Sequence, residues 1–173
     1  MGKFLQSYCS NGVVFCFFFG TILTTHASLS QFSVRLPDTT AEVGMKLKIP
    51  LRVSELKPFA VTSFSFVVSC DTNVATLDGV EQEGTLAQEA LLAANNHVGP
   101  FHAGRMKVAS ASGVPYSGKG ILAYLVVSLK KTVGVTALIL SQFNANGDST
   151  KARVTNGSLK SVARKVQKPE PKK

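Results

Sequence analysis

The chain has 173 residues, of which 45% are hydrophobic, 8% aromatic and 17% charged, and its formal net charge is +9. This profile is typical of one globular domain and excludes collagen-like, coiled-coil and low-complexity chains. Six basic residues lie in residues 160–173 against a single acidic residue, so much of the positive charge belongs to one end of the chain. We therefore expect no nucleic-acid partner.

The N-terminal segment has the features of a secretory signal. Residues 13–23 form an apolar run that follows Lys3, and small residues stand just before Ser28. A run of this length is too short to cross a bilayer as a helix. We predict a signal peptide over residues 1–27 with cleavage after Ala27, an uncleaved membrane anchor being the alternative. The mature protein is then expected to be secreted or at the cell surface, with no membrane span.

The remaining chain divides into a domain and a tail. Residues 28–160 are enough to bury a core without metals or disulfides, and Cys70 is the single cysteine among them. We expect that thiol to be a small buried apolar group. Residues 161–173 are polar, basic and rich in proline and lysine, which predicts a flexible tail. The tail either solubilises or links the domain, or holds it near an anionic surface.

Short segments with a period of two fill the domain in chain order. Residues 45–53 alternate strictly between apolar and polar side chains, which predicts a strand. Pro50 lacks a backbone donor, so this strand is expected to be at an edge or bulged there. Turn residues separate most of the segments, which indicates a β-sandwich. The other predicted strands are 32–36, 63–70, 74–77, 105–112, 120–130, 137–143, 152–155 and 158–162.

One segment departs from this pattern. Residues 85–94 consist of good helix formers, with Leu86, Ala90 and Ala93 on one side. These features predict a short helix. The following residues, 95–104, are rich in turn formers and are expected to be a loop that leads back into a strand.

A phosphate-binding motif is matched only in part. Residues 113–120 read G-x-x-x-x-G-K, but Gly120 stands where the motif needs Ser or Thr. A β-rich run follows, whereas phosphate binding needs the start of a helix at that point. We therefore interpret residues 113–120 as a loop between two strands and expect no nucleotide or other cofactor.

The sequence offers little metal-binding chemistry. His97 and His102 have neither the spacing nor the neighbouring carboxylates of a metal site. Asn144, Asn146 and Asp148 alternate as in a calcium loop but provide one carboxylate and no distal Glu. We expect no resident metal, and Asn146 followed by glycine primarily indicates a hairpin.

Catalytic patterns are also missing from the sequence. There is no G-x-S-x-G elbow, and the acidic residues are scattered over different predicted elements. We therefore interpret the protein as a non-enzyme.

Five motifs follow one another along the domain. They are VGMKLKIPLRV at 43–53, FSFVVSCDTNV at 64–74, GRMKVASAS at 104–112, SGKGILAYL at 117–125 and VTNGSL at 154–159. In this order they resemble the motifs of the cohesin domain, a secreted β-sandwich that binds dockerin domains in cellulosomes and related surface assemblies. The motif that resembles "φ-x-φ-x-φ-x-Y-D-P-x-V" has Cys70 for Tyr and Thr72 for Pro, and residues 85–96 form a helix-prone insertion. The closing V-x-N-G-S-φ motif is intact.

The resemblance implies a nine-stranded jelly-roll β-sandwich with one short helix. It also implies a dockerin-like protein partner, with any calcium held by that partner, and a binding sheet that contains the strands beginning at Ser63, Arg105 and Gly120. Dockerin-binding cohesins often carry Asn and Asp where this chain has Ser63 and Ser65. We expect a monomer.

Alternation predicts which side chains face outward on these strands. If Phe64, Phe66 and Val68 fill the core, their neighbours lie outside. An outward row of Leu122, Tyr124 and Val126 would form an apolar patch with Tyr124 as its anchor. The alternative is that the opposite parity is buried or that the chain itself covers the patch. The predicted partner-binding residues are Ser63, Ser65, Val67, Arg105, Lys107, Ala109, Leu122, Tyr124 and Val126.

Two other functions fit a secreted β-sandwich. A carbohydrate-binding module, with polysaccharide as partner, would need an exposed aromatic platform, but the chain has no Trp and only three tyrosines, Tyr8, Tyr116 and Tyr124. A secreted hydrolase would need paired carboxylates or a nucleophile in a cleft. Both are weaker than protein recognition.

Overall fold

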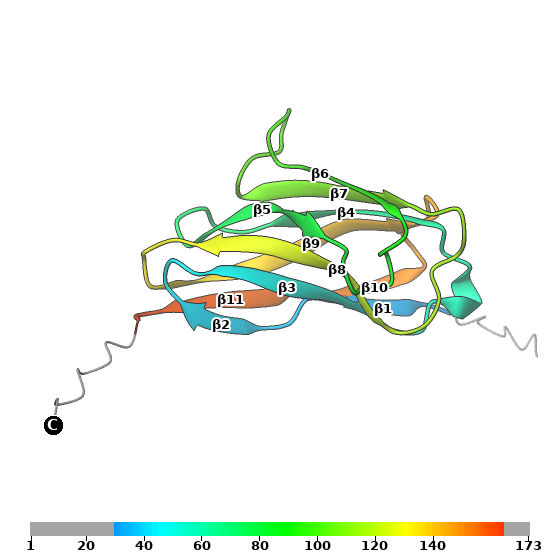
Figure 1. The fold of residues 1–173 in the computed structure, drawn as a ribbon, viewed down its shortest axis with the longest axis horizontal. Helices are drawn as coiled ribbons and strands as arrows, with labels where there is room; N and C mark the ends of the chain where they lie inside the picture. Colours follow the sequence, from blue (N-terminus) through cyan, green and yellow to red (C-terminus); the bar gives the residue numbers. More distant parts are fainter. Residues whose placement is uncertain (1–29, 165–173) are drawn as a thin grey trace, which may run out of the picture.

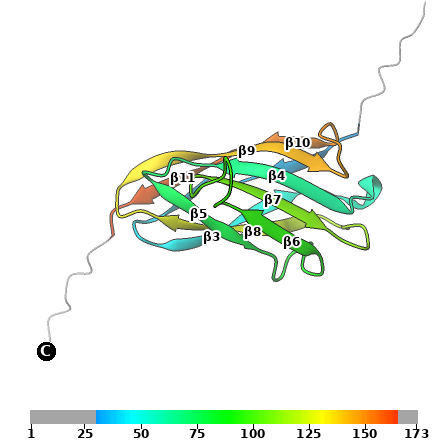
Figure 2. The same ribbon diagram turned by 90° about the horizontal axis from the view of Figure 1, so that it is seen from above.

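The computed structural model describes residues 30–164, which form two β-sheets stacked face to face (Figures 1 and 2). The sheets have the strand orders β10-β1-β3-β8-β5 and β2-β11-β9-β4-β7-β6. The predicted all-β sandwich is confirmed, with 11 strands in the described range rather than nine. The predicted signal peptide lies outside the described residues, as does most of the predicted tail.

Each predicted strand segment overlaps an observed strand, and β2 and β6 are additional. The five-stranded sheet consists of β10 (Ala152–Thr155), β1 (Phe32–Arg35), β3 (Lys46–Val53), β8 (Gly120–Leu129) and β5 (Ala75–Glu81). The six-stranded sheet consists of β2 (Thr39–Glu42), β11 (Gly157–Val162), β9 (Gly134–Ala145), β4 (Ser63–Ser69), β7 (Arg105–Ala111) and β6 (Leu91–Asn95).

The core lies between the two sheets and contains aromatic stacks. Phe64 and Phe66 on β4 both stack on Phe143 of β9, with interplanar angles of 7°. Val68 is fully buried on the same side of β4, as the alternation predicts. Burial of each such side chain stabilises the fold by about 2 kcal/mol. Cys70 is only half-buried but packs against this core.

Two of the passages of the chain from the five-stranded sheet to the six-stranded sheet lie side by side. The chain passes from β1 to β2 and from β10 to β11. Strand β1 pairs in parallel with β10, and β2 pairs in parallel with β11. A side chain at Gly157 would collide with the carbonyl oxygens of Leu36 and Pro37, so glycine is required at this crossing. Asn156 accepts a hydrogen bond from the Leu140 backbone N–H at 2.9 Å. Gly157 therefore allows the two crossings to approach each other closely, and Asn156 ties the second crossing to β9.

Strand β11 extends slightly beyond residue 160, where the domain was expected to end and the flexible tail to begin. It ends at Val162, and Ser161 is fully buried. The Ser161 hydroxyl donates to the Thr132 carbonyl and accepts from the Gly134 N–H, each at 2.8 Å. These bonds account for a buried serine at the end of the sheet.

The helix predicted over residues 85–94 is wrong. Residues 85–90 form turns, and β6 begins at Leu91 and pairs antiparallel with β7. The Gln82 side-chain amide donates to the carbonyls of Gln88 and Ala90, while the Leu86 N–H donates to the Ile121 carbonyl. Pairing with neighbouring strands thus overrides local helix propensity. Within residues 30–164, no helix is long and apolar enough to span a membrane.

Two other local predictions are confirmed. The part of β3 that contains Pro50 pairs only with β8, because β1 reaches β3 only at Arg52 and Val53, so Pro50 lies on a local edge. Residues 113–120 connect β7 to β8 as a loop.

Candidate functional site

Six of the nine predicted binding residues lie on one face. Strand β4 runs between β9 and β7, and its register places Ser65 between Asn144 and Ala109. Directly opposite residues on antiparallel strands share a face. The outer face of the six-stranded sheet, here called the β4 face, therefore carries Ser63, Ser65, Val67, Arg105, Lys107 and Ala109.

The centre of the β4 face is flat because its side chains are small. Ala109 and Ala93 are exposed and lie opposite each other on β7 and β6. Val67 is buried but does not belong to the core cluster, so its neighbours on the outer face cover it. Larger apolar side chains lie at the margins, with Leu91 82% exposed on β6 and Ile139 45% exposed on β9.

The charged groups that β4 and β7 contribute to this face are cationic. Lys107 is exposed, and the Arg105 guanidinium lies over the Phe101 ring at 5.8 Å from its centroid. Such stacking orients the guanidinium while leaving its N–H donors available. Neither cation forms an ion pair with any residue in the range 30–164. The face therefore favours an acidic or hydrogen-bond-accepting partner.

A buried hydroxyl pair holds β6 in place beside β7. The Ser110 hydroxyl donates to the Leu91 carbonyl at 2.9 Å and accepts from the Tyr116 hydroxyl at 2.8 Å. Burial raises the pKa of the Tyr116 phenol above its usual value, so it remains a donor. These contacts fix the edge of the β4 face on which Leu91 is exposed.

A β-bulge lies at Gln142, towards the C-terminal end of β9. Ser65 pairs with Asn144 while Val67 pairs with Ser141, so two residues of β9, Gln142 and Phe143, oppose Phe66 alone. Gln142 has φ 52°, in the left-handed region, and is exposed. This conformation costs about 1 kcal/mol for a residue with a Cβ. The sequence carries no glycine or asparagine that would have indicated this bulge, so sequence reasoning missed Gln142.

The other three predicted binding residues lie elsewhere, which corrects the prediction of a single face. Leu122, Tyr124 and Val126 are on β8, and β8 belongs to the five-stranded sheet rather than to the sheet of β4 and β7. The two groups of residues are on opposite sheets of the sandwich. The prediction that the strands beginning at Ser63, Arg105 and Gly120 share one sheet was therefore wrong.

The predicted exposure of Leu122 is also wrong. Leu51 pairs with Ala123 and Arg52 pairs with Ile121, so Leu122 is an extra residue between two paired positions. Such a bulge shifts the alternation by one residue. As a result Leu122 is only 1% exposed and belongs to the core.

Val126 faces outward but is covered. It pairs with Lys48 on β3, and Lys48 forms an ion pair with Glu81 on β5, so the pair spans β8. Val126 is 6% exposed, and Tyr124 is half-buried. The hydrogen bond with Glu81, followed by its charge, raises the pKa of Lys48 above its usual value. The exposed apolar row predicted on β8 is therefore not present.

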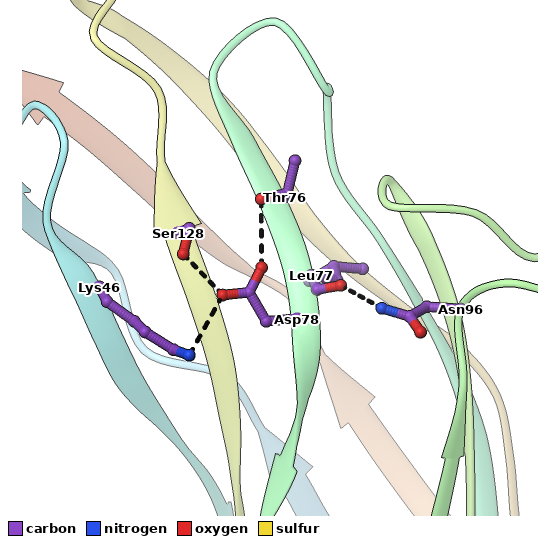
Figure 3. A network of polar contacts seen from close by, with 6 residues as sticks. All are labelled: Lys46, Thr76, Leu77, Asp78, Asn96 and Ser128. Carbon is purple, nitrogen blue, oxygen red and sulfur yellow. Dashed lines mark hydrogen bonds and ion pairs between the residues drawn. The ribbon is translucent and has the colours of Figure 1, made fainter.

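A second polar link crosses the same strand (Figure 3). The Asp78 carboxylate accepts a hydrogen bond from Ser128 at 2.6 Å and lies 3.6 Å from the Lys46 ammonium group. On the other side of β5, the buried amide of Asn96 donates to the Leu77 carbonyl at 2.6 Å. These bonds join β3, β8 and β5 and tie the 96–104 loop to the free edge of β5, which protects that edge.

The described residues contain no group of three or more His, Cys, Asp and Glu that could hold a metal. The calcium-like segment uses its side chains locally instead. Asn146 accepts hydrogen bonds from the backbone N–H groups of Thr62 and Ser63, and Asp148 accepts from Thr150. His102 Nδ1 accepts from the Gly104 N–H. These contacts position turns.

Comparison with known proteins identifies similar domains. A non-cellulosomal cohesin from the hyperthermophilic archaeon Archaeoglobus fulgidus matches with a TM-score of 0.64 and 23% identity, over 78% of this chain and 93% of that chain. The seventh ScaB type I cohesin from Pseudobacteroides cellulosolvens matches with a TM-score of 0.63 and 18% identity, over 82% and 98%. No curated protein matches the sequence.

A third similar structure comes from a type I cohesin–dockerin complex of Clostridium thermocellum, with a TM-score of 0.63, 14% identity and coverage of 78% and 96%. At these identities the similarity shows the fold. The family model for the cohesin domain matches residues 32–166, which include every strand of both sheets. The chain belongs to the cohesin domain family.

Proposed function

We propose that this chain is a non-catalytic module that binds a dockerin-type domain through the β4 face. The observation that carries the proposal is that Ser63, Ser65, Val67, Arg105, Lys107 and Ala109 share the outer face of one sheet. Membership of the cohesin family supports a protein partner, and several similar structures were solved as complexes with dockerins. Calcium, where it is needed, belongs to the dockerin.

The β4 face has the composition of a protein interface. A flat centre of small residues lets a partner approach the backbone closely, and Leu91 and Ile139 supply apolar contact area at the margins. Arg105 and Lys107 add charge at one end of the face. An apolar surface with a polar, charged rim is the usual organisation of a specific protein complex.

Ser63 and Ser65 are expected to influence partner choice. A serine hydroxyl is shorter than the Asn and Asp side chains that dockerin-binding cohesins often carry there, and it is uncharged. The face therefore lacks an acidic group near its centre while retaining two cations. We expect a partner with acidic residues or hydrogen-bond acceptors rather than basic residues at the contact.

The setting that we propose is extracellular. The signal-like residues 1–27 support export, and the cohesin family is a group of protein-binding modules of extracellular assemblies. A secreted or cell-surface module that recruits a partner by non-covalent contact accounts for both features.

The test measures dockerin binding after a blocking substitution. Ala109→Arg places a long charged side chain at the exposed centre of the β4 face. Titration calorimetry of the full chain against a panel of dockerins with calcium should show binding, and the variant should weaken it by at least about 100-fold because the partner can no longer lie flat. Thr155→Arg is the matched control, since it adds the same side chain to an exposed position of β10 in the other sheet.

Tyr124→Ala distinguishes the two sheets. If the β4 face binds the partner, this substitution on β8 leaves the affinity unchanged. Loss of binding in Tyr124→Ala together with normal binding in Ala109→Arg would assign the contact to the five-stranded sheet and refute the proposal. Binding to insoluble polysaccharide without binding to any dockerin would support a carbohydrate-binding module instead.

A further inference from the structure

A hollow of about 290 Å³ on the outer face of the five-stranded sheet is lined by residues of β1, β3 and the start of β8. These three strands are neighbours in that sheet. It is far from the β4 face in the fold, because the two outer faces belong to opposite sheets. Its lining combines cationic and hydroxyl side chains and consists of Ser33, Arg35, Arg52, Val53, Ser54, Lys119 and Gly120.

The cations of this hollow are close together and unneutralised. Arg35 on β1 is directly opposite Arg52 on β3, and both are exposed. Like charges at directly opposite positions of an antiparallel pair destabilise a sheet. None of Arg35, Arg52 and Lys119 forms an ion pair with a residue of the described part of the chain. An anion bound between them would remove this repulsion.

Neighbouring groups strengthen the positive potential. Arg153 on β10 is opposite Ser33 and adds a further cation beside the hollow. The nearby Glu55 carboxylate does not line the hollow, and it accepts hydrogen bonds from the N–H groups of Lys57 and Gly118. No acidic side chain is among the lining residues, so nothing in the lining repels an anion.

The hydroxyl groups add neutral donors. Ser54 Oγ accepts a hydrogen bond from the Ser33 N–H at 2.9 Å, which leaves its own hydrogen available for a ligand. With the guanidinium groups and the Lys119 ammonium group, the lining side chains supply hydrogen-bond donors from β1, from β3 and from the residue before β8. A set of donors with planar guanidinium forks matches carboxylate, sulfate and phosphate groups.

We propose that this hollow binds a small organic oxyanion of about monosaccharide size, such as a sugar acid or a sugar phosphate. The charged oxygens contact Arg35, Arg52 and Lys119, and the uncharged part of the molecule contacts the serine hydroxyls. The volume of the hollow, about 290 Å³, is close to the lower limit of about 300 Å³ for small-molecule sites, which favours a small organic anion over a larger ligand. The proposal does not rest on dockerin binding, since it concerns the opposite sheet.

The test is a titration of the ¹⁵N-labelled full chain with glucose 6-phosphate, galacturonate, inorganic phosphate and neutral glucose. The sugar phosphate or the sugar acid should shift the backbone amide signals of Ser33, Ser54 and Gly120, with a Kd of about 1 mM or tighter. Glucose should not shift them. Arg35→Gln and Arg52→Gln should each weaken binding by about tenfold. Both positions are exposed, so neither substitution disturbs the core.

Lys46→Gln is the matched control, because Lys46 is an exposed cation on the same strand as Arg52 but at its other end. It should leave the Kd unchanged. Equal weakening in Lys46→Gln and Arg52→Gln would indicate only a general charge effect and would overturn the site. Absence of binding by both anionic sugars would also overturn it. Inorganic phosphate binding as tightly as glucose 6-phosphate would overturn the assignment of an organic ligand.

Discussion

Replacing Leu122 by Ala tests the most consequential difference between sequence pattern and structure. Simple alternation along β8 places Leu122 in solvent, whereas the bulge opposite Leu51 and Arg52 places it in the core at 1% exposure. Removing a fully buried leucine side chain costs both its burial energy and the cavity that is left. We expect Leu122→Ala to lower the free energy of unfolding by about 3 kcal/mol, which lowers the Tm by roughly 10 °C.

The measurement is urea unfolding followed by far-UV circular dichroism, because the chain has no Trp for fluorescence. Leu91→Ala is the matched control, since it removes the same atoms from a side chain that is 82% exposed. We expect the control to change stability by less than about 0.5 kcal/mol. Equal stability of the two variants would place Leu122 in solvent and would refute the conclusion that the bulge buries this side chain.

Two further predictions concern the hairpin and the thiol. Asn146→Ala should lower the free energy of unfolding, measured in urea, by about 2 kcal/mol, because Asn146 has φ 52° and its side chain forms hydrogen bonds with Thr62, Ser63 and Ala60. Asn146→Gly should restore the turn conformation but not those hydrogen bonds. Wild-type stability of the Ala variant would contradict this prediction. Burial, with a smaller contribution from Asp71, raises the pKa of the Cys70 thiol from 9.0 to about 11. Peptide mapping should therefore find that Cys70 is alkylated slowly at neutral pH, and fast alkylation of the native thiol would refute its protection. The free energy of unfolding should fall as the pH rises from 9.0 towards about 11, because the thiol ionises at a lower pH in the unfolded chain than in the folded one.

The sequence was sufficient to predict the sandwich because the motif residues have structural roles. Gly157 permits close passage of the chain at the sheet crossing, and Asn156 binds the β9 backbone. Gly104 lies where a side chain would clash with Thr72, next to the start of β7. Asp71 accepts a hydrogen bond from the Asn73 N–H in a turn. Residues of this kind are required by the backbone path, so their order in the sequence predicts the path.

The orientation of β8 could not be predicted in the same way. Residues 121–127 are apolar or aromatic at every position, so no polar residue marks the outer face. A one-residue bulge then changes which side chains are buried without changing the composition. The position of β8 in the sheet depends on its pairing with β3 and β5, and both of these strands are far from β8 in the sequence. Local pattern contains no information about either feature.

The error at residues 85–94 has a similar cause. The segment contains strong helix formers, but its backbone is fixed by partners elsewhere, including the Ile121 carbonyl and residues 107–111 of β7. A short isolated helix is marginal in water, so a few tertiary hydrogen bonds are enough to replace it. The insertion consequently becomes an additional edge strand, and Leu91 gains its exposed position beside the β4 face.

The two proposed contacts use opposite sheets, and this separation determines how they influence each other. Stacked sheets lie about 10 Å apart, and the interior between these two is filled by packed side chains. A ligand in the hollow at Arg35 and Arg52 therefore cannot collide with a partner on the β4 face. The remaining influence is electrostatic, and it is screened over about 8 Å at physiological ionic strength. Each face can consequently be altered by substitution without changing the geometry of the other.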